Sequence, residues 1–170
     1  MNNKHLNKFI TKLQKNFSKT FGADGTKTTL IISDKATIKV TLVDTKSTPT
    51  TDINGNKAKT FSGGVTAKMG NSQKNSFTVS ASVDNQNISS NDMARAFEHE
   101  AGHTVGLRHP FDNKQTILDI KQGAKGVKPS TVANNLMNSD ANPINPSNNG
   151  EKLTKGQFES MDKLIESQQP

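Results

Sequence analysis

The spacing of apolar residues predicts a helix at the start of the chain. Apolar side chains recur there every three or four positions, which is the period of an amphipathic helix, at Leu6, Phe9, Ile10, Leu13 and Phe17. Lysines occupy many of the positions between them. Gly22 and Gly25 follow the last apolar residue, and glycine commonly ends a helix because it adopts a left-handed conformation.

The middle of the chain has the composition and the alternation of β-strands. Runs of β-branched residues predict strands at Thr28–Ser33 and Ala36–Asp44, and the polar stretch Thr45–Lys57 predicts a loop. Two further strands are predicted at Thr60–Ala67 and Ser76–Val83. Apolar residues alternate with polar ones in the second of these, so one of its faces should be buried. The residues on that face are Phe77, Val79, Ala81 and Val83.

Beyond these strands the helical period returns. Several N-cap residues precede a helix predicted over Met93–Leu107, which Gly106 closes. The segment Pro110–Ala133 has little periodicity, and the last helix should begin at Thr154, with Gln157 completing a capping box. This order predicts an α+β fold, a mixed twisted sheet of about five strands with an N-terminal, a central and a C-terminal helix. A length of 170 residues fits a single domain.

The composition limits the kinds of metal site and the cellular locations that we expect. The chain has no Cys, so disulfides and thiolate metal sites are excluded. No apolar run approaches the ~18 residues of a membrane span, and the Lys-rich N-terminus does not have the pattern of a secretory signal. We therefore expect a domain that is secreted or exported as part of a longer precursor, or a cytoplasmic protein if this chain is complete.

The positive charge is concentrated in the first half of the chain. Residues 1–80 carry 13 Lys and 4 Asp, which gives +9, and residues 81–170 carry 9 basic and 11 acidic residues, which gives −2, so that the total is +7. The lysines of the first half are dispersed singly, and no aromatic residues alternate with them as in a base-stacking surface. We interpret them as a solvated face and expect no nucleic-acid partner.

Three of the four histidines fall within eleven residues. His99 and His103 are four positions apart, so a helix presents both imidazoles on one face. His109 cannot share that face on a continuous helix, but a left-handed Gly106 would stop the helix and turn the chain back. Three neutral imidazoles would then hold Zn²⁺ and leave the fourth tetrahedral position for water. Asp112 is the one substitute we consider for the third ligand.

Glu100 follows the first of these histidines. A carboxylate beside a zinc-bound water can take its proton as attack begins, so we expect Glu100 to be the general base of a peptide hydrolysis without covalent intermediate. The five fixed positions of this pattern should arise by chance about once in 10⁵ chains of this size. We therefore favour a zinc endopeptidase over the two alternatives, uninvolved histidines and an inactive zinc-binding module.

The segment His99–His109 resembles the extended zinc signature of the metzincin metallopeptidases. These enzymes place a Met in a tight turn beneath the metal, and Asn134–Ser139 is similar to that turn, with Met137 as its methionine. The resemblance implies an upper subdomain of about residues 1–106 and a lower subdomain of about residues 107–170. The chain has no Tyr, which astacins and serralysins use as a further ligand, so pappalysin-like or compact bacterial metzincins are more similar.

The resemblance also implies where a substrate would bind. In metzincins the last strand before the active-site helix pairs with an extended peptide, so Ser76–Val83, with Phe77, Val79 and Ala81, should be the edge strand facing the cleft. The chain after the Met-turn forms the outer wall of a specificity pocket in that family, which here would bring in Asn138 and Ile144. Arg95 lies four residues before His99 and would reach the pocket floor, or else be a solvated residue early in the helix.

The sequence is compatible with more than one biological role and with several kinds of partner. Some compact bacterial metzincins are toxin domains released from large secreted proteins, so an effector protease aimed at one protein is the alternative biological role. Restraint would then come from a separate inhibitor or immunity protein. Asp52–Asn56 has oxygen ligands at alternating positions, but its Gly is misplaced for an EF-hand, so Ca²⁺ is a weaker interpretation than a polar turn. We expect a monomer that acts on protein or peptide substrates.

Overall fold

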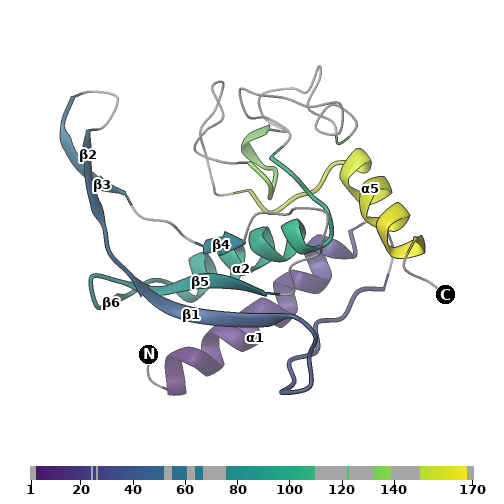
Figure 1. Cartoon of the computed structure of the whole chain (residues 1–170), viewed down its shortest axis with the longest axis horizontal. Helices are drawn as coiled ribbons and strands as arrows, with labels where there is room; N and C mark the ends of the chain where they lie inside the picture. Colours follow the sequence, from purple (N-terminus) through teal and green to yellow (C-terminus); the bar gives the residue numbers. More distant parts are fainter. Residues whose placement is uncertain are drawn as a thin grey trace. The chain divides into compact units, whose positions relative to one another are not determined.

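A computed structural model of the chain describes residues 3–23, 25, 27–51, 55–60, 64–66, 76–109, 122, 132–138 and 150–167 (Figure 1). The helices are α1 (Asn3–Phe21), α2 (Ser90–Thr104) and α5 (Lys155–Glu166). The strands are β1 (Lys39–Thr45), β2 (Thr48–Thr51), β3 (Lys57–Thr60), β4 (Gly64–Thr66), β5 (Ser76–Val83) and β6 (Gln86–Asn87). This part of the chain is therefore α+β, as predicted. Within it, no helix is both long and apolar enough to cross a bilayer.

The chain folds into two compact units that interleave along the sequence. The first consists of Met1–Leu13 and Ile31–Glu100, and the second of Gln14–Leu30 and Ala101–Pro170. Both α1 and α2 therefore begin in the first unit and end in the second. The division into an upper and a lower subdomain near residue 106 stays a prediction.

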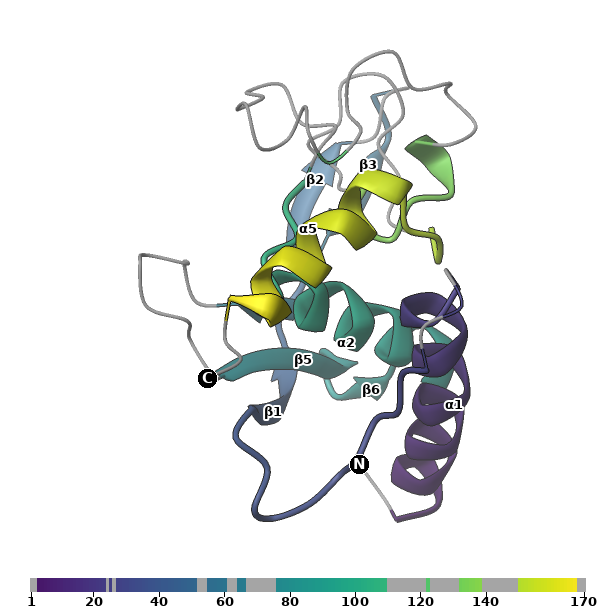
Figure 2. The same ribbon diagram turned by 90° about the vertical axis from the view of Figure 1, so that its right-hand side faces the viewer.

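A small mixed sheet organises the first unit. Its strands lie in the order β1, β5, β4, with β1 parallel to β5 and β4 antiparallel to it (Figure 1), and Figure 2 shows β6 beside the end of β5. The short β6 pairs antiparallel with the end of β5. Asp84 and Asn85 connect these two strands with φ values of 50° and 65°, a two-residue turn of the kind that Asp and Asn tolerate.

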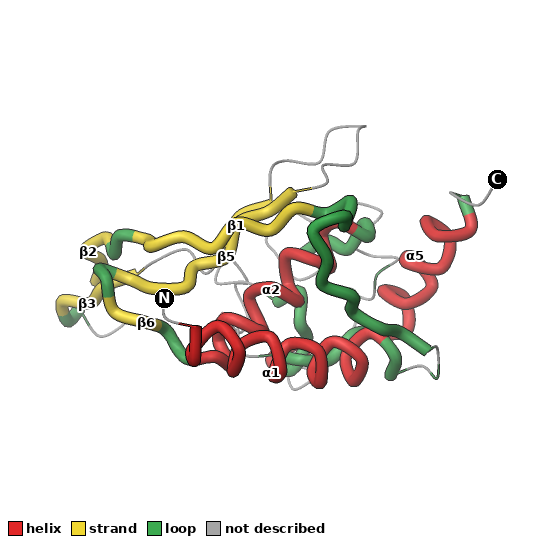
Figure 3. Tube along the Cα trace, turned by 90° about the horizontal axis from the view of Figure 1, so that it is seen from below, coloured by secondary structure: helices red, strands yellow, loops and turns green. Residues whose placement is uncertain are grey.

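The core of this unit is layered, with α2 between the sheet and the first half of α1 (Figure 3). The ring of Phe97 on α2 contacts Phe77 of β5 at a centroid distance of 5.1 Å and Phe9 of α1 at 6.4 Å, both edge to face. Edge-to-face ring pairs contribute about 0.5–1.5 kcal/mol beyond the area that they bury. The buried face of β5 and the apolar face of α1 thus both contact the side chain of Phe97.

One strand prediction and one loop prediction were wrong. Thr28–Ser33 forms no strand, and its Ile31 and Ile32 are exposed, because β-branched composition favours an extended backbone but does not supply a pairing partner. Conversely, the predicted loop Thr45–Lys57 contains β2, which pairs antiparallel with β3 as a two-stranded ribbon. All four residues of β2 are exposed, so this ribbon has no apolar alternation by which it could have been predicted.

The expected edge position of Ser76–Val83 was also wrong. The bounds of β5 agree with the prediction, but the strand pairs with β1 on one side and with β4 and β6 on the other. Phe77, Val79 and Ala81 are buried, with 3%, 0% and 6% of their surface exposed. They are core residues of an inner strand, since strong alternation reports a buried face and not a free edge.

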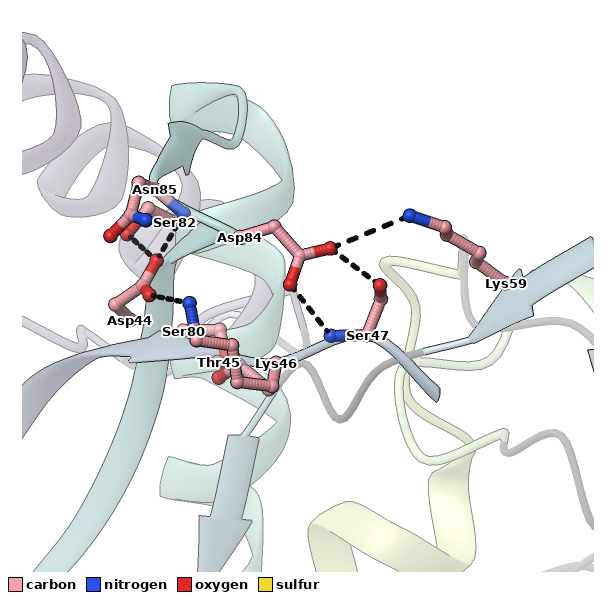
Figure 4. Close-up of polar contacts among 9 residues, drawn as sticks. All are labelled: Asp44, Thr45, Lys46, Ser47, Lys59, Ser80, Ser82, Asp84 and Asn85. Carbon is pink, nitrogen blue, oxygen red and sulfur yellow. Dashed lines mark hydrogen bonds and ion pairs between the residues drawn. The ribbon is translucent and has the colours of Figure 1, made fainter. Parts of the chain in front are cut away.

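Asp84 ties the ribbon to the sheet, and Asp44 ties β1 to the end of β5 and the turn after it (Figure 4). Asp84 accepts hydrogen bonds from Ser47 Oγ at 2.5 Å and from Ser47 N at 3.3 Å, and Lys59 Nζ lies 3.8 Å away. The Ser47 hydroxyl and amide, then Lys59, hold the pKa of Asp84 below its usual value. The pKa of Asp44 is lowered in the same way by the Ser82 hydroxyl and the Asn85 amide, with Lys46 adding to the effect.

In the second unit, a cluster of apolar side chains holds the segments that follow α2. Its buried members are Phe21, Leu107, Leu136, Met137 and Met161. Phe17 lies against the cluster, and its ring contacts that of Phe21 in a tilted arrangement at a centroid distance of 4.4 Å. The end of α1, the turn after α2, the segment around residue 136 and α5 therefore share one core.

The lowered pKa values predict acid sensitivity of the first unit. A carboxyl group whose folded pKa lies below the unfolded value of about 3.9 stabilises the fold above that pH, and the contribution is lost as the pH falls through the folded pKa. Asp84→Asn should therefore lower the urea midpoint at pH 7 and flatten its decline below about pH 4. Urea unfolding measured from pH 7 to pH 2.5 tests this.

Asp34→Asn is the matched control, because Asp34 accepts one exposed hydrogen bond, from Ser33 Oγ at 3.4 Å. It should leave the pH dependence close to that of the wild type. Equal profiles for the wild type and Asp84→Asn would contradict the prediction.

Candidate metal centre

The helix that carries the histidines begins with an N-cap at Ser89. Ser89 Oγ accepts a hydrogen bond from Asp92 N at 3.1 Å and donates one to the Asp92 carboxylate at 2.6 Å. The bond from Asp92 N satisfies one of the backbone donors that the first helical turn leaves without partners. The helix therefore starts at Ser90, three residues earlier than predicted.

The helix ends in a left-handed turn at Gly106, which has φ +85°. Leu107 N donates to Gly102 O at 2.9 Å and Gly106 N donates to His103 O at 3.2 Å, the hydrogen-bond pattern of a Schellman motif. The last helical residue is Thr104, so the predicted end at Leu107 was three residues too late. The predicted role of Gly106 is confirmed, because the chain leaves the helix axis there.

The turn brings the third histidine to the other two. The ligand atoms of His99, His103 and His109 all lie within 4.8 Å of one another, and all three side chains are partly buried. His103 Nε2 and His109 Nε2 are 3.1 Å apart, and the two rings meet edge to face at 4.7 Å between centroids. The predicted ligand set is therefore present as a group that could hold one metal ion.

A hydrogen bond at Nδ1, on the side of the ring away from His109, fixes the orientation of His103. Its Nδ1 lies 2.8 Å from the carbonyl oxygen of Leu107, which can only accept a hydrogen bond. Nδ1 must therefore carry the proton, and the Nε2 lone pair points toward His109. A backbone carbonyl in this role sets the tautomer of a ligand and raises its basicity.

Gln122 was missed by the sequence reasoning. Its side chain is buried, with Oε1 accepting from Arg108 N at 3.0 Å and Nε2 donating to Gly106 O at 3.1 Å. The amide thus pairs with the backbone on both sides of Leu107. A glutamine in an aperiodic segment carries no signal that would assign it this position, because the contact depends on the tertiary fold.

The segment predicted to be a Met-turn forms a tight turn. Asn138 N donates to Asn135 O at 3.1 Å, and the Asn135 side chain accepts from Met137 N at 2.9 Å. Met137 is fully buried and lies against α2 at Gly102, where an added Cβ would be 2.7 Å from the Met137 sulfur. Because Gly102 directly precedes His103, the methionine supports the turn of helix that carries a ligand.

A buried amide network holds this turn in place. Asn135 and Gln157 pair through their side chains at 2.7 and 3.2 Å, and both are almost fully buried. Thr154 and Gln157 form the predicted capping box of α5, with Thr154 N donating to Gln157 Oε1 at 2.8 Å and Gln157 N donating to Thr154 Oγ1 at 3.2 Å. Gln157 thus connects the start of α5 to the Met-turn.

Of the remaining predicted site residues, the structure describes Glu100, Arg95 and Asn138. Glu100 lies on α2 between the two helical histidines and is buried, with 6% of its surface exposed. Arg95 is half-buried on the same helix, and its pocket role stays a prediction. Asn138 is fully buried, so its side chain does not present a free surface to a substrate. Ile144 and Asp112 lie outside the described residues.

Only part of the segment considered for calcium is described. Gly55, with φ +82°, and Asn56 lie in the connection between β2 and β3. This conformation fits a turn. Asp52, Ile53 and Asn54 lie outside the described residues, so Ca²⁺ at this place stays a prediction.

No family profile, curated protein or solved structure matches this chain. The assignment of the metal centre therefore depends on its own geometry and chemistry.

His109 should matter most to the metal, because it is the ligand that only the turn at Gly106 supplies. His109→Ala should lower zinc affinity by at least about 100-fold, more than the usual loss of an outer-shell partner. Competition with a chromophoric chelator measures this. His5→Ala, a change on α1 outside the group, should leave the affinity unchanged. Equal affinities for the wild type and His109→Ala would remove His109 from the ligand set.

Gly102→Ala should destabilise the fold although alanine is the better helix former. The new Cβ would lie 2.7 Å from the Met137 sulfur and 3.4 Å from Leu107 Cδ1, both in a buried cluster. Overpacking of this kind costs about 1–3 kcal/mol, against a gain of up to about 1 kcal/mol in helix propensity. Thermal unfolding tests the sign.

Removal of the Met137 sulfur in both backgrounds provides the control. Met137→Ala should cost less stability in the Gly102→Ala background than in the wild type, because the contact that strains the first variant is then gone. Strictly additive effects of the two changes would show that Gly102 and Met137 do not press on each other.

Proposed function

We propose that this chain is a zinc-dependent endopeptidase of the metzincin type. The observation that carries the proposal is the convergence of His99, His103 and His109, with Glu100 between the two helical histidines. Histidines without a shared function would not be expected to place their ring nitrogens together from the two sides of a helix end. The Met137 turn packed against α2 supports the same interpretation.

The donor set fits zinc. Three neutral imidazoles are a common protein ligand set for catalytic Zn²⁺, with Zn–N distances of about 2.0–2.1 Å. Tetrahedral ligands at that distance are about 3.4 Å from one another, close to the 3.1 Å between His103 Nε2 and His109 Nε2. Cys is absent from the chain, so a thiolate site is excluded. His99, His103 and His109 would hold the ion.

The chemistry that the ion would supply is that of a Lewis acid, which polarises the scissile carbonyl and acidifies a water molecule. The remaining steps belong to protein groups. The Glu100 carboxylate takes a proton from the attacking water and returns it to the nitrogen of the leaving amine. The Leu107 carbonyl accepts the proton of His103 Nδ1, which leaves the Nε2 lone pair of this ring for the metal.

The position of Glu100 suits a proton carrier better than a ligand. It is one residue after His99 and three before His103, so it projects from a helix face next to the ligands. Its burial limits the water around the carboxylate. A carboxylate held there has no evident packing role, since apolar residues fill such positions at lower desolvation cost.

Glu100→Gln should separate metal binding from turnover. Zinc stoichiometry should stay near one with the wild-type affinity, because the three imidazoles are intact, and hydrolysis of a quenched casein substrate should fall by about 10²–10⁴-fold, the usual contribution of a general base. Zinc content by atomic absorption and the initial rate are measured on the same sample.

Glu98→Gln is the matched control, a second buried glutamate of α2 two residues earlier. Glu98 directly precedes His99 but lies on the opposite side of α2 from Glu100, so the change should affect stability more than turnover. A zinc-loaded wild type that does not cleave casein, gelatin or a peptide library would reject the peptidase proposal and leave a zinc-binding module. Loss of zinc in Glu100→Gln would show that Glu100 is itself a ligand.

A further inference from the structure

Five backbone polar groups of residues 106–108 are hydrogen-bonded to side chains or to the end of α2. Gly106 N and Leu107 N donate to the end of α2, and Leu107 O accepts from His103. Gly106 O and Arg108 N both pair with Gln122. Leu107 is fully buried in the apolar cluster. His109 is the next residue after this held segment.

Gln122 is itself held in place through its backbone carbonyl. Its backbone carbonyl accepts a hydrogen bond from Thr154 Oγ1 at 2.7 Å. Thr154 also forms the capping box of α5 with Gln157. A chain of contacts therefore runs from the start of α5 through Gln122 to the segment that ends at His109.

The amide chemistry suits this task in a way that no charged or apolar side chain would. One end of the group must donate, to Gly106 O, and the other must accept, from Arg108 N. An amide reproduces both partners of a neighbouring β-strand without placing a charge beside a cationic metal site. A carboxylate would confront the Gly106 carbonyl, and an apolar group would remove the partners of two backbone groups whose hydrogen bonds are partly buried.

We propose that Gln122 is the positioning residue of the third metal ligand, through which the N-terminus of α5 fixes where His109 meets the other two imidazoles. The inference depends on the metal centre proposed above but not on peptidase activity. It predicts that losses at Gln122 appear in metal binding and not only in stability.

Gln122→Met and Gln122→Glu test the two halves of the contact. Methionine keeps the volume and removes both hydrogen bonds, and glutamate keeps the acceptor and removes the donor. Both should lower zinc affinity about 10–100-fold, the usual effect of an outer-shell partner. The visible spectrum of the Co²⁺-substituted protein should shift toward that of His109→Ala, because the third imidazole no longer occupies a defined position.

Met161→Ala is the control for stability alone. Met161 belongs to the same apolar cluster, is 7% exposed, and lies on α5. It should unfold more readily while keeping the wild-type zinc affinity and Co²⁺ spectrum. If the Gln122 variants behave like Met161→Ala, with lower stability and unchanged metal binding, Gln122 is a structural residue and the proposal is overturned.

A double-mutant cycle makes the assignment specific. In the His109→Ala background, Gln122→Met should cause no further loss of zinc affinity, since the ligand that it positions is already gone. Additive losses would mean that Gln122 acts through His99 or His103 and would also overturn the proposal. A wild type that binds zinc tightly without hydrolysing peptides would reject the peptidase function while leaving this inference intact.

Discussion

One α-helix can present two imidazoles to the same ion but not three, and the arrangement of this site follows from that limit. The helix must end directly after His103, and the chain must then reverse within a few residues. Gly106 does this with a positive φ, and the hydrogen bonds of the turn return Leu107 to the core. Leu107 in turn fixes His103 through its carbonyl and anchors the second unit through its side chain.

The supports of the metal centre are neutral amides and hydroxyls. Gln122, Asn135, Gln157 and Thr154 form two connected sets of hydrogen bonds, one behind the segment before His109 and one behind Met137. Such groups hold the backbone in a defined position, because each offers a hydrogen-bond donor and an acceptor. They also add no charge to a site whose proposed chemistry depends on a divalent cation and one carboxylate.

The sequence predicted best what local patterns determine. The first helix, the bounds of β5, the capping box at Thr154 and the left-handed Gly106 all depend on residues within a few positions. The three histidines could be grouped because a helix and a glycine turn have known geometry. What failed required partners distant in sequence: the unpaired Thr28–Ser33, the solvated ribbon of β2 and β3, the inner place of β5, and Gln122.

The interleaving of the two units has a consequence for how the chain acquires its structure. The first unit needs Phe9 and Phe97 in contact across 88 positions of sequence, and the second needs Phe21 beside Met161. Closing such long loops delays folding, because their entropy is lost before the contacts form. During synthesis neither core can close until α2 has left the ribosome, so the metal ligands on that helix emerge before the scaffold that orients them is complete.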